Sequence, residues 1–149
     1  MRTFGTVEEL EAAVGVELGH SEWVEITQER IDEFAHATGD HQWIHVDPER
    51  AANGPFGSTI AHGYLTASMI PALTKQIFSI TAKMAINYGI NKLRFPSPVP
   101  VGSAVRATST FVDVSKPGDA VQVVTSTVIS VRGADKPAVV AEHVGRYYL

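Results

Sequence analysis

The chain has 149 residues, a formal net charge of -4 and no cysteine. This length suits one domain with a buried core, over residues 1–149, and the charge leaves no basic face for nucleic acid. The lack of cysteine excludes disulfides, zinc–thiolate sites and a cysteine nucleophile, and with no apolar span and no secretory signal we expect a cytoplasmic protein without membrane insertion.

The N-terminal region is expected to be a helical extension of residues 1–20. Thr6 and Glu9 have the spacing of a capping box, which predicts a short helix over about residues 7–13. A short strand over residues 22–26 is expected to follow, because apolar and polar side chains alternate there.

Two further helices have clear end signals. Thr27 is the expected cap of a helix over residues 28–37, and Gly39 should end this helix in a left-handed conformation. Asp47 and Pro48 have the character of the cap and the first position of another short helix.

Residues 60–77 predict a helix at the centre of the fold. Their apolar side chains are not confined to one stripe, which is typical of a helix that is buried nearly all round. Several small residues allow a sheet to approach closely. Pro71 lacks an amide hydrogen, so we expect it to kink or divide this helix.

The second half of the chain predicts an antiparallel meander. Side-chain alternation favours four strands, over residues 84–95, 101–114, 121–131 and 138–148. The first of these changes parity, which indicates a bulge near Gly89 or Asn91. A sheet of this kind must cover the central helix, so the sequence predicts an α+β domain.

One segment combines groups that perform acid–base chemistry. Asp40 and His45 stand five positions apart, in a turn that follows Gly39. A carboxylate and an imidazole placed in this way can hold one water molecule and move its proton. Simpler roles stay open, because Asp40 could cap the turn and His45 could be a satisfied buried histidine. A metal site that includes His41 is not expected, since the four-residue histidine spacing needs a helix and Gly39 favours a loop.

This segment resembles the hydratase motif of the MaoC-like (R)-specific enoyl-CoA hydratases, a branch of the hot-dog fold. The motif runs aromatic-Ala-x-x-Thr/Ser-Gly-Asp-x-Asn-Pro-aliphatic-His-x-Asp, and its matches here are Phe34, Ala35, Thr38, Gly39, Asp40, Ile44, His45 and Asp47. Gln42 and Trp43 stand where Asn-Pro is usual. Residues 60–63, 87–89 and 94–99 are similar to later parts of the family pattern. The similarity begins near Ser21, looks strongest to stand-alone, single-hot-dog actinobacterial members, and implies an antiparallel sheet wrapped around a long central helix.

The resemblance implies a hydro-lyase that reversibly adds water to trans-2-enoyl-CoA and forms (R)-3-hydroxyacyl-CoA. It implies that Asp40 and His45 activate the water and that the Gly63 N–H contacts the thioester oxygen. The other expected substrate-binding residues lie before the central helix and in the first long strand: Ile60, Ala61, His62, Asn87, Tyr88, Gly89, Lys92 and Arg94. No cofactor is expected beyond the coenzyme A of the substrate. The resemblance also implies a homodimer, since hot-dog proteins usually join their sheets, and this agrees with the liability of an unpaired edge strand.

Several alternatives remain open at this point. The same fold could serve an acyl-CoA thioesterase, an acyl-carrier-protein dehydratase subunit that needs a partner chain, or a non-catalytic acyl-thioester-binding module. His62 could simply orient the helix start, and Tyr88 could be a packed core residue. Lys92 and Arg94 could meet the phosphates of coenzyme A or remain solvated.

Overall fold

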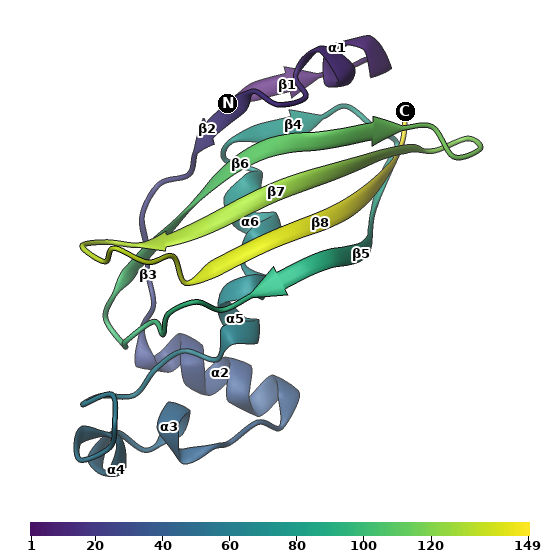
Figure 1. Cartoon of the computed structure of the whole chain (residues 1–149). Coiled ribbons are helices and arrows are strands. Elements are labelled where there is room, and N and C mark those ends of the chain that lie inside the picture. The colour runs from purple at the N-terminus through teal and green to yellow at the C-terminus, as the bar shows by residue number, and fades with distance from the viewer.

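A six-stranded antiparallel sheet curves around a central pair of helices in the computed structural model, which describes residues 1–149 (Figure 1). The strands follow the order β2-β6-β7-β8-β5, and β3 also pairs with β6. Their bounds are β2 (Glu17–His20), β3 (Val24–Glu25), β5 (Met84–Arg94), β6 (Ala104–Ser115), β7 (Val121–Val131) and β8 (Val139–Tyr148). A separate parallel pair consists of β1 (Arg2–Phe4) and β4 (Phe78–Ile80).

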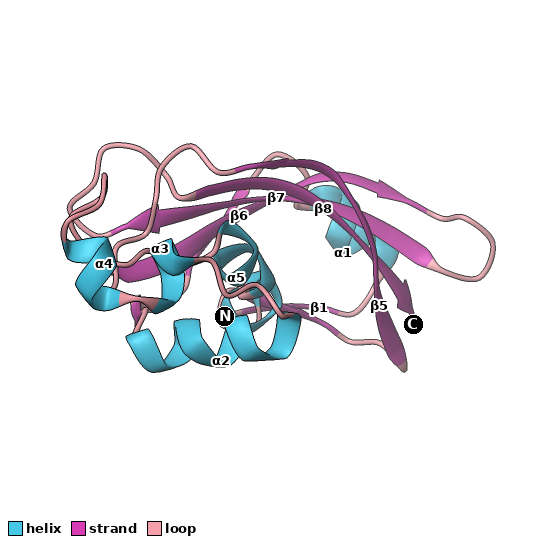
Figure 2. Ribbon diagram, turned by 90° about the horizontal axis from the view of Figure 1, so that it is seen from below, coloured by secondary structure: helices cyan, strands magenta, loops and turns pink.

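The helices lie mainly on the concave side of the sheet. Figure 2 shows the sheet arched over α5, with α2, α3 and α4 gathered at one end beneath it. The helices are α1 (Val7–Ala12), α2 (Gln28–Thr38), α3 (Trp43–Val46), α4 (Pro48–Ala52), α5 (Gly63–Ser68) and α6 (Ile70–Thr74). All of them are too short or too polar to cross a membrane.

The predicted helix ends are confirmed. The Thr6 hydroxyl accepts from the Glu9 N–H, and the Glu9 carboxylate accepts from the Thr6 N–H, which completes the capping box of α1. The Thr27 side chain caps α2, and Gly39 ends it at φ 79°. The Asp47 carboxylate caps α4. These signals act over three or four residues, so they are independent of the rest of the fold.

The central helix is divided, as predicted. α5 ends at Ser68 and α6 begins at Ile70, so the missing N–H of Pro71 falls in a first turn that needs no such donor. The expected burial all round is wrong, because the sheet covers only one face of the helix. Its outer stripe stays exposed, at Tyr64, Ser68, Pro71, Ala72, Lys75 and Gln76.

The strand pairing differs from the predicted meander at one place. β6, β7 and β8 do form consecutive antiparallel pairs, but β5 pairs with β8 instead of β6. The connection from β5 to β6 crosses the end of the sheet, so β5 becomes an edge strand. The predicted bulge is confirmed by two register shifts in β5, at Asn87/Gly89 and at Ile90/Lys92.

Residues 1–20 are more than a helical extension. They contain α1, but they also supply β1 and β2, which were not predicted, and β2 belongs to the main sheet. Phe4 and Leu10 join the hydrophobic core of 24 buried residues. The Phe111 ring of β6 contacts Phe4 and Phe78, with centroids 5.2 and 4.9 Å apart, and so ties the N-terminal region to the sheet.

Candidate active site

Three titratable side chains meet where the ends of α2, α3 and α5 come together. Asp40, His45 and His62 each place one carboxylate oxygen or ring nitrogen within 4.8 Å of the others. Asp40 directly follows Gly39 at the end of α2, His45 lies in α3, and His62 precedes α5. The structure therefore brings Asp40 and His45 together as the sequence predicts, and it adds His62.

The local backbone explains how Asp40 and His45 are held. The segment expected to be an open turn forms the one-turn helix α3, in which the Asp47 N–H donates to the Trp43 carbonyl. The Gln42 N–H donates to the Asp40 carboxylate at 3.3 Å. The Trp43 ring packs under the Arg50 guanidinium at 4.3 Å. The Gln42 bond uses the backbone, which the usual Asn also has, whereas the Trp43 side chain adds a contact that proline could not make.

The His45 ring presents one free basic nitrogen. Its side chain is 7% exposed, and its Nδ1 lies 2.7 Å from the Ile60 carbonyl oxygen. Because a carbonyl only accepts, Nδ1 carries the proton and Nε2 keeps its lone pair. Burial has the largest effect on the pKa of His45 and lowers it. The Ile60 carbonyl raises it by less, and the still smaller effects of the His62 ring and of Asp40 act in opposite directions. His45 is therefore a neutral imidazole at neutral pH.

His62 connects Asp40 to the central helix. Its Nε2 donates to the Asp40 backbone carbonyl at 2.9 Å, and its ring stacks on His45 with 3.8 Å between centroids. The Phe34 ring lies 5.0 Å away. His62 Nδ1 is buried without a hydrogen-bond partner. The stacking fixes the position of the His45 ring relative to the start of α5.

The same three groups are chemically able to bind a metal ion. However, His45 and His62 each use one ring nitrogen on a backbone carbonyl, and their rings are stacked with 24° between planes. The remaining lone pairs thus lie in nearly parallel planes instead of converging on one tetrahedral centre. His41 is exposed and is not part of this group. The geometry suits a bound water better than a metal ion.

A cavity of about 290 Å³ joins His45 to the start of α5. Ile60, Ala61 and Gly63 line it, as do Thr66 and the Phe95 ring. A Cβ at Gly63 would lie 2.9 Å from the Phe95 ring, so only glycine fits there without displacing that ring. Gly63 is also the first residue of α5, where a backbone N–H has no partner within the helix.

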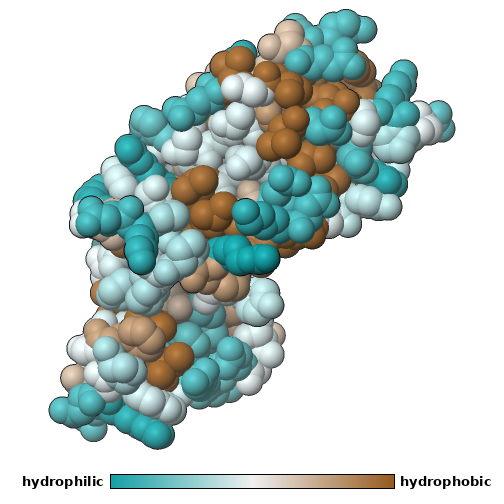
Figure 3. All heavy atoms as spheres, viewed as in Figure 1, coloured by the Kyte–Doolittle hydropathy of each residue, from teal (hydrophilic) through white to brown (hydrophobic).

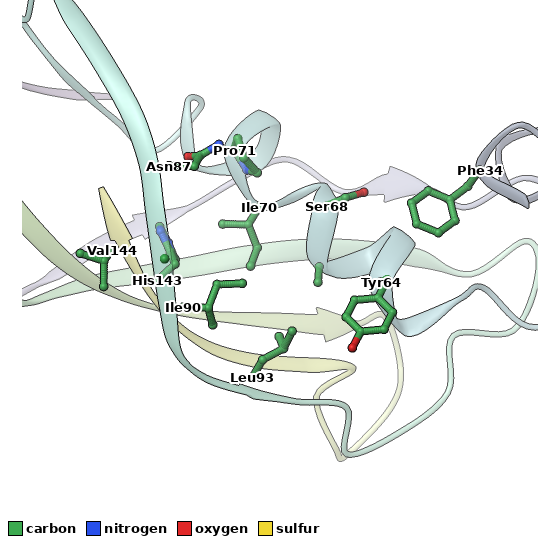
Figure 4. A pocket seen from close by; sticks show the side chains of 12 residues that line it. Phe34, Tyr64, Ser68, Ile70, Pro71, Asn87, Ile90, Leu93, His143 and Val144 are labelled. Carbon is green, nitrogen blue, oxygen red and sulfur yellow. The ribbon is translucent and has the colours of Figure 1, made fainter. Parts of the chain in front are cut away.

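A second cavity, of about 490 Å³, lies along one side of the central helix, between it and strands β5 and β8 (Figure 4). Its near end includes Phe34 and Tyr64, and its far end includes Ile70 and His143. The Tyr64 ring meets the Phe95 ring edge-on, with centroids 5.6 Å apart. Tyr64 lines the larger cavity and Phe95 the smaller one, so this ring pair stands where the two cavities approach each other.

Comparison with known proteins identifies the family of this chain. Residues 9–134 match the model described as a MaoC like domain. The chain belongs to the MaoC-like family. It is 58% identical over 149 residues to 3-hydroxyacyl-thioester dehydratase Z of Mycobacterium tuberculosis, covering 99% of each chain. The unliganded R-hydratase PhaJ1 of Pseudomonas aeruginosa superposes with a TM-score of 0.72 at 26% identity, covering 95% of this chain and 84% of that one. The (R)-hydratase of A. caviae superposes with a TM-score of 0.71 at 27% identity, covering 88% of this chain and 96% of that one. The predicted hot-dog fold is thereby confirmed.

The other substrate-binding residues predicted for this MaoC-like chain are only partly brought together. Asn87 and Gly89 line the larger cavity. Tyr88, Lys92 and Arg94 line neither cavity described above. The Tyr88 ring lies 3.4 Å from the Arg146 guanidinium carbon, and Lys92 and Arg94 are exposed.

Phe95 and His143 were missed by the sequence interpretation of this MaoC-like domain. Phe95 falls inside the segment that resembles the family, but no local pattern places its ring against Gly63. His143 lies in a predicted strand, where only the strand pairing determines what it faces. Both positions depend on contacts between distant parts of the chain.

Proposed function

We propose that this MaoC-like protein is a hydro-lyase that interconverts trans-2-enoyl-CoA and (R)-3-hydroxyacyl-CoA. The observation that carries the proposal is the meeting of Asp40 and His45 beside a cavity that His45 shares with Gly63. Names of similar proteins support it, since one relative is a 3-hydroxyacyl-thioester dehydratase and two structural neighbours are (R)-hydratases. The proposal includes no cofactor and no metal.

Water activation is the task of the carboxylate and the imidazole. A water held between the Asp40 carboxylate and His45 Nε2 finds two acceptors for its two hydrogens. As its oxygen attacks the β-carbon, one proton passes to this pair, and the pair delivers a proton to the α-carbon. One C–O and one C–H bond form while one O–H bond of the water and the C=C π bond are broken, so the overall change is the addition of water. Because the two groups are coupled, they titrate as a unit.

The developing enolate oxygen needs a donor that is already in place. The Gly63 N–H lies at the start of α5 and on the wall of the cavity that contains His45. We assign it the thioester oxygen. A preorganised donor of this kind is typically worth about 2.7–4 kcal/mol in the transition state. The acyl chain then continues toward the larger cavity.

The proposed active form is a homodimer. β5 pairs only with β8, so its other edge is open. Its large apolar side chains are exposed, at Met84, Ile86, Tyr88 and Ile90. Figure 3 shows further apolar side chains, in brown, on the face of the molecule that Figure 1 presents to the viewer. An open, apolar edge strand is stabilised by pairing with a second copy.

The test is a product assay with the purified chain and short to medium trans-2-enoyl-CoA substrates. Hydration consumes the conjugated-thioester absorbance and yields the (R)-3-hydroxy product without free thiol. Release of free thiol would replace the proposal with a thioesterase. Activity that appears only with a second protein, or only with acyl-carrier-protein substrates, would replace it with a dehydratase subunit. Binding without turnover would indicate a non-catalytic module.

A further inference from the structure

A row of hydrogen-bonded polar side chains crosses the inner face of the sheet. The Ser109 and Thr127 hydroxyls lie 2.9 Å apart, and the Thr127 hydroxyl lies 3.0 Å from His143 Nε2. Ser109 is 1% exposed and Thr127 is fully buried. Apolar side chains would pack here at lower desolvation cost, so a buried polar row in a core position calls for a reason beyond packing.

The row ends at the wall of the larger cavity. His143 lines both this cavity and an adjoining one of about 240 Å³, together with Ile70, Pro71 and Asn87. Figure 4 shows the His143 ring beside Ile90, with Asn87 next to Pro71. Nε2 is occupied by Thr127, whereas Nδ1 has no partner in the protein. The row therefore fixes the ring and leaves one ring nitrogen available to a ligand.

The larger cavity begins beside the candidate active site, whose Asp40, His45 and Gly63 do not line it, and ends at His143. Phe34 lines its near end and also contacts His62, with 5.0 Å between ring centroids. Ile70, at the far end, follows Gly63 by seven residues, which corresponds to about 10 Å along a helix. That is the length of a medium-chain acyl group. No lysine, arginine or acidic residue lines this cavity.

We propose that His143 binds a hydroxyl group carried by the acyl chain far from its thioester, so that the enzyme prefers hydroxylated medium-chain substrates. This inference rests on the proposed function. A hydroxyl both donates and accepts, so it satisfies Nδ1 in either tautomer. Asn87, at the same junction of cavities, offers a second polar group. Burial lowers the pKa of His143, which keeps the ring neutral and unsuited to a carboxylate.

The test compares trans-2-enoyl-CoA substrates of equal length, unsubstituted or with a hydroxyl on successive carbons of the far half. For at least one position of the hydroxyl, we expect kcat/KM to be roughly tenfold higher than for the unsubstituted substrate. A tenfold change is at the upper end of what one hydrogen bond contributes. H143L should bring this ratio to about one. T127V, which frees the ring to turn, should lower it. S126A is the matched control, because Ser126 lies in β7 beside Thr127 but lines none of these cavities.

The two proposals fail in different ways. If the wild type hydrates unsubstituted substrates but favours no hydroxylated one, the His143 inference is overturned and the proposed function stands. A preference that survives in H143L also overturns it. If the wild type hydrates no substrate, the proposed function fails. The His143 inference is then tested alone, by comparing the binding of saturated acyl-CoA molecules with and without the hydroxyl. The wild-type comparison decides even where a variant does not fold.

Discussion

The imidazole rings of His45 and His62 stack at 3.8 Å between centroids, and each ring donates one N–H to a backbone carbonyl. The carbonyl that accepts from His62 belongs to Asp40, so one contact chain runs from the carboxylate residue through His62 to His45. A positive charge on either ring would repel a charge on the other. Together with the burial of His45, which is the main cause of its lowered pKa, the arrangement therefore keeps this ring neutral beside Asp40.

Removing either member of the pair should abolish most turnover. In Asp40→Asn the side chain loses its charge, and in His45→Gln it loses the basic Nε2, so we expect kcat/KM to fall by about 10²–10⁴ for each. Steady-state hydration kinetics with a thermal melt of each variant provide the measurement. His41→Gln is the control, because His41 is exposed and outside the cluster. Folded variants with near wild-type activity would eliminate this mechanism.

A methyl group at Gly63 should interfere with the site through Phe95. The new Cβ would lie 2.9 Å from that ring, and overpacking of this kind costs about 1–3 kcal/mol. We expect Gly63→Ala to lower kcat/KM and stability together. The double variant Gly63→Ala/Phe95→Leu should recover part of both losses, because the smaller side chain vacates the contested space. A double-mutant cycle with no coupling energy would show that the two residues do not compete.

Stability should fall as the solution becomes mildly acidic. Burial lowers the pKa of both His45 and His143 below the ordinary value of 6.5. Between each lowered pKa and 6.5 the unfolded chain binds more protons than the folded chain. The stabilising contribution of these two histidines is therefore complete above pH 6.5. It is lost as the pH falls through this window, so the free energy of unfolding decreases there. Urea unfolding at several pH values measures this slope. His143→Leu should reduce the slope, and an unchanged slope in that variant would contradict the assignment.

A charge on the open edge of β5 should disrupt the dimer. Ile86 is 42% exposed on this edge strand, so Ile86→Lys should shift the protein toward monomers in analytical ultracentrifugation. Val112→Lys is a matched control, since Val112 is 44% exposed but lies in β6. A wild-type protein that sediments as a monomer at micromolar concentration would refute the proposed homodimer.

The features predictable from the sequence are those determined by nearby residues. Thr6 with Glu9, Thr27 and Gly39 act through bonds to the adjacent turn of the helix, so their positions specify their roles. The approach of Asp40 and His45 follows from their short separation and from the motif. Those features do not depend on the order of the strands.

The features that escaped prediction depend on distant contacts. His62 reaches the Asp40 carbonyl across 22 positions of sequence. β5 pairs with β8 because the connection after Phe95 crosses the sheet, and no local pattern distinguishes this from a hairpin. The orientation of His143 depends on that pairing and on two register shifts in β5. Alternation alone therefore cannot determine which side chains reach the cavity.

The two bulges in β5 also define where this enzyme can adapt. They flank Gly89 and Ile90, which form part of the wall opposite Pro71 in the larger cavity. Moving either bulge by one residue would turn a different side chain inward and make the space shorter or deeper. Asp40, His45 and Gly63 lie on other segments and would keep their places. Chain-length preference could thus diverge between related proteins while the reaction itself is conserved.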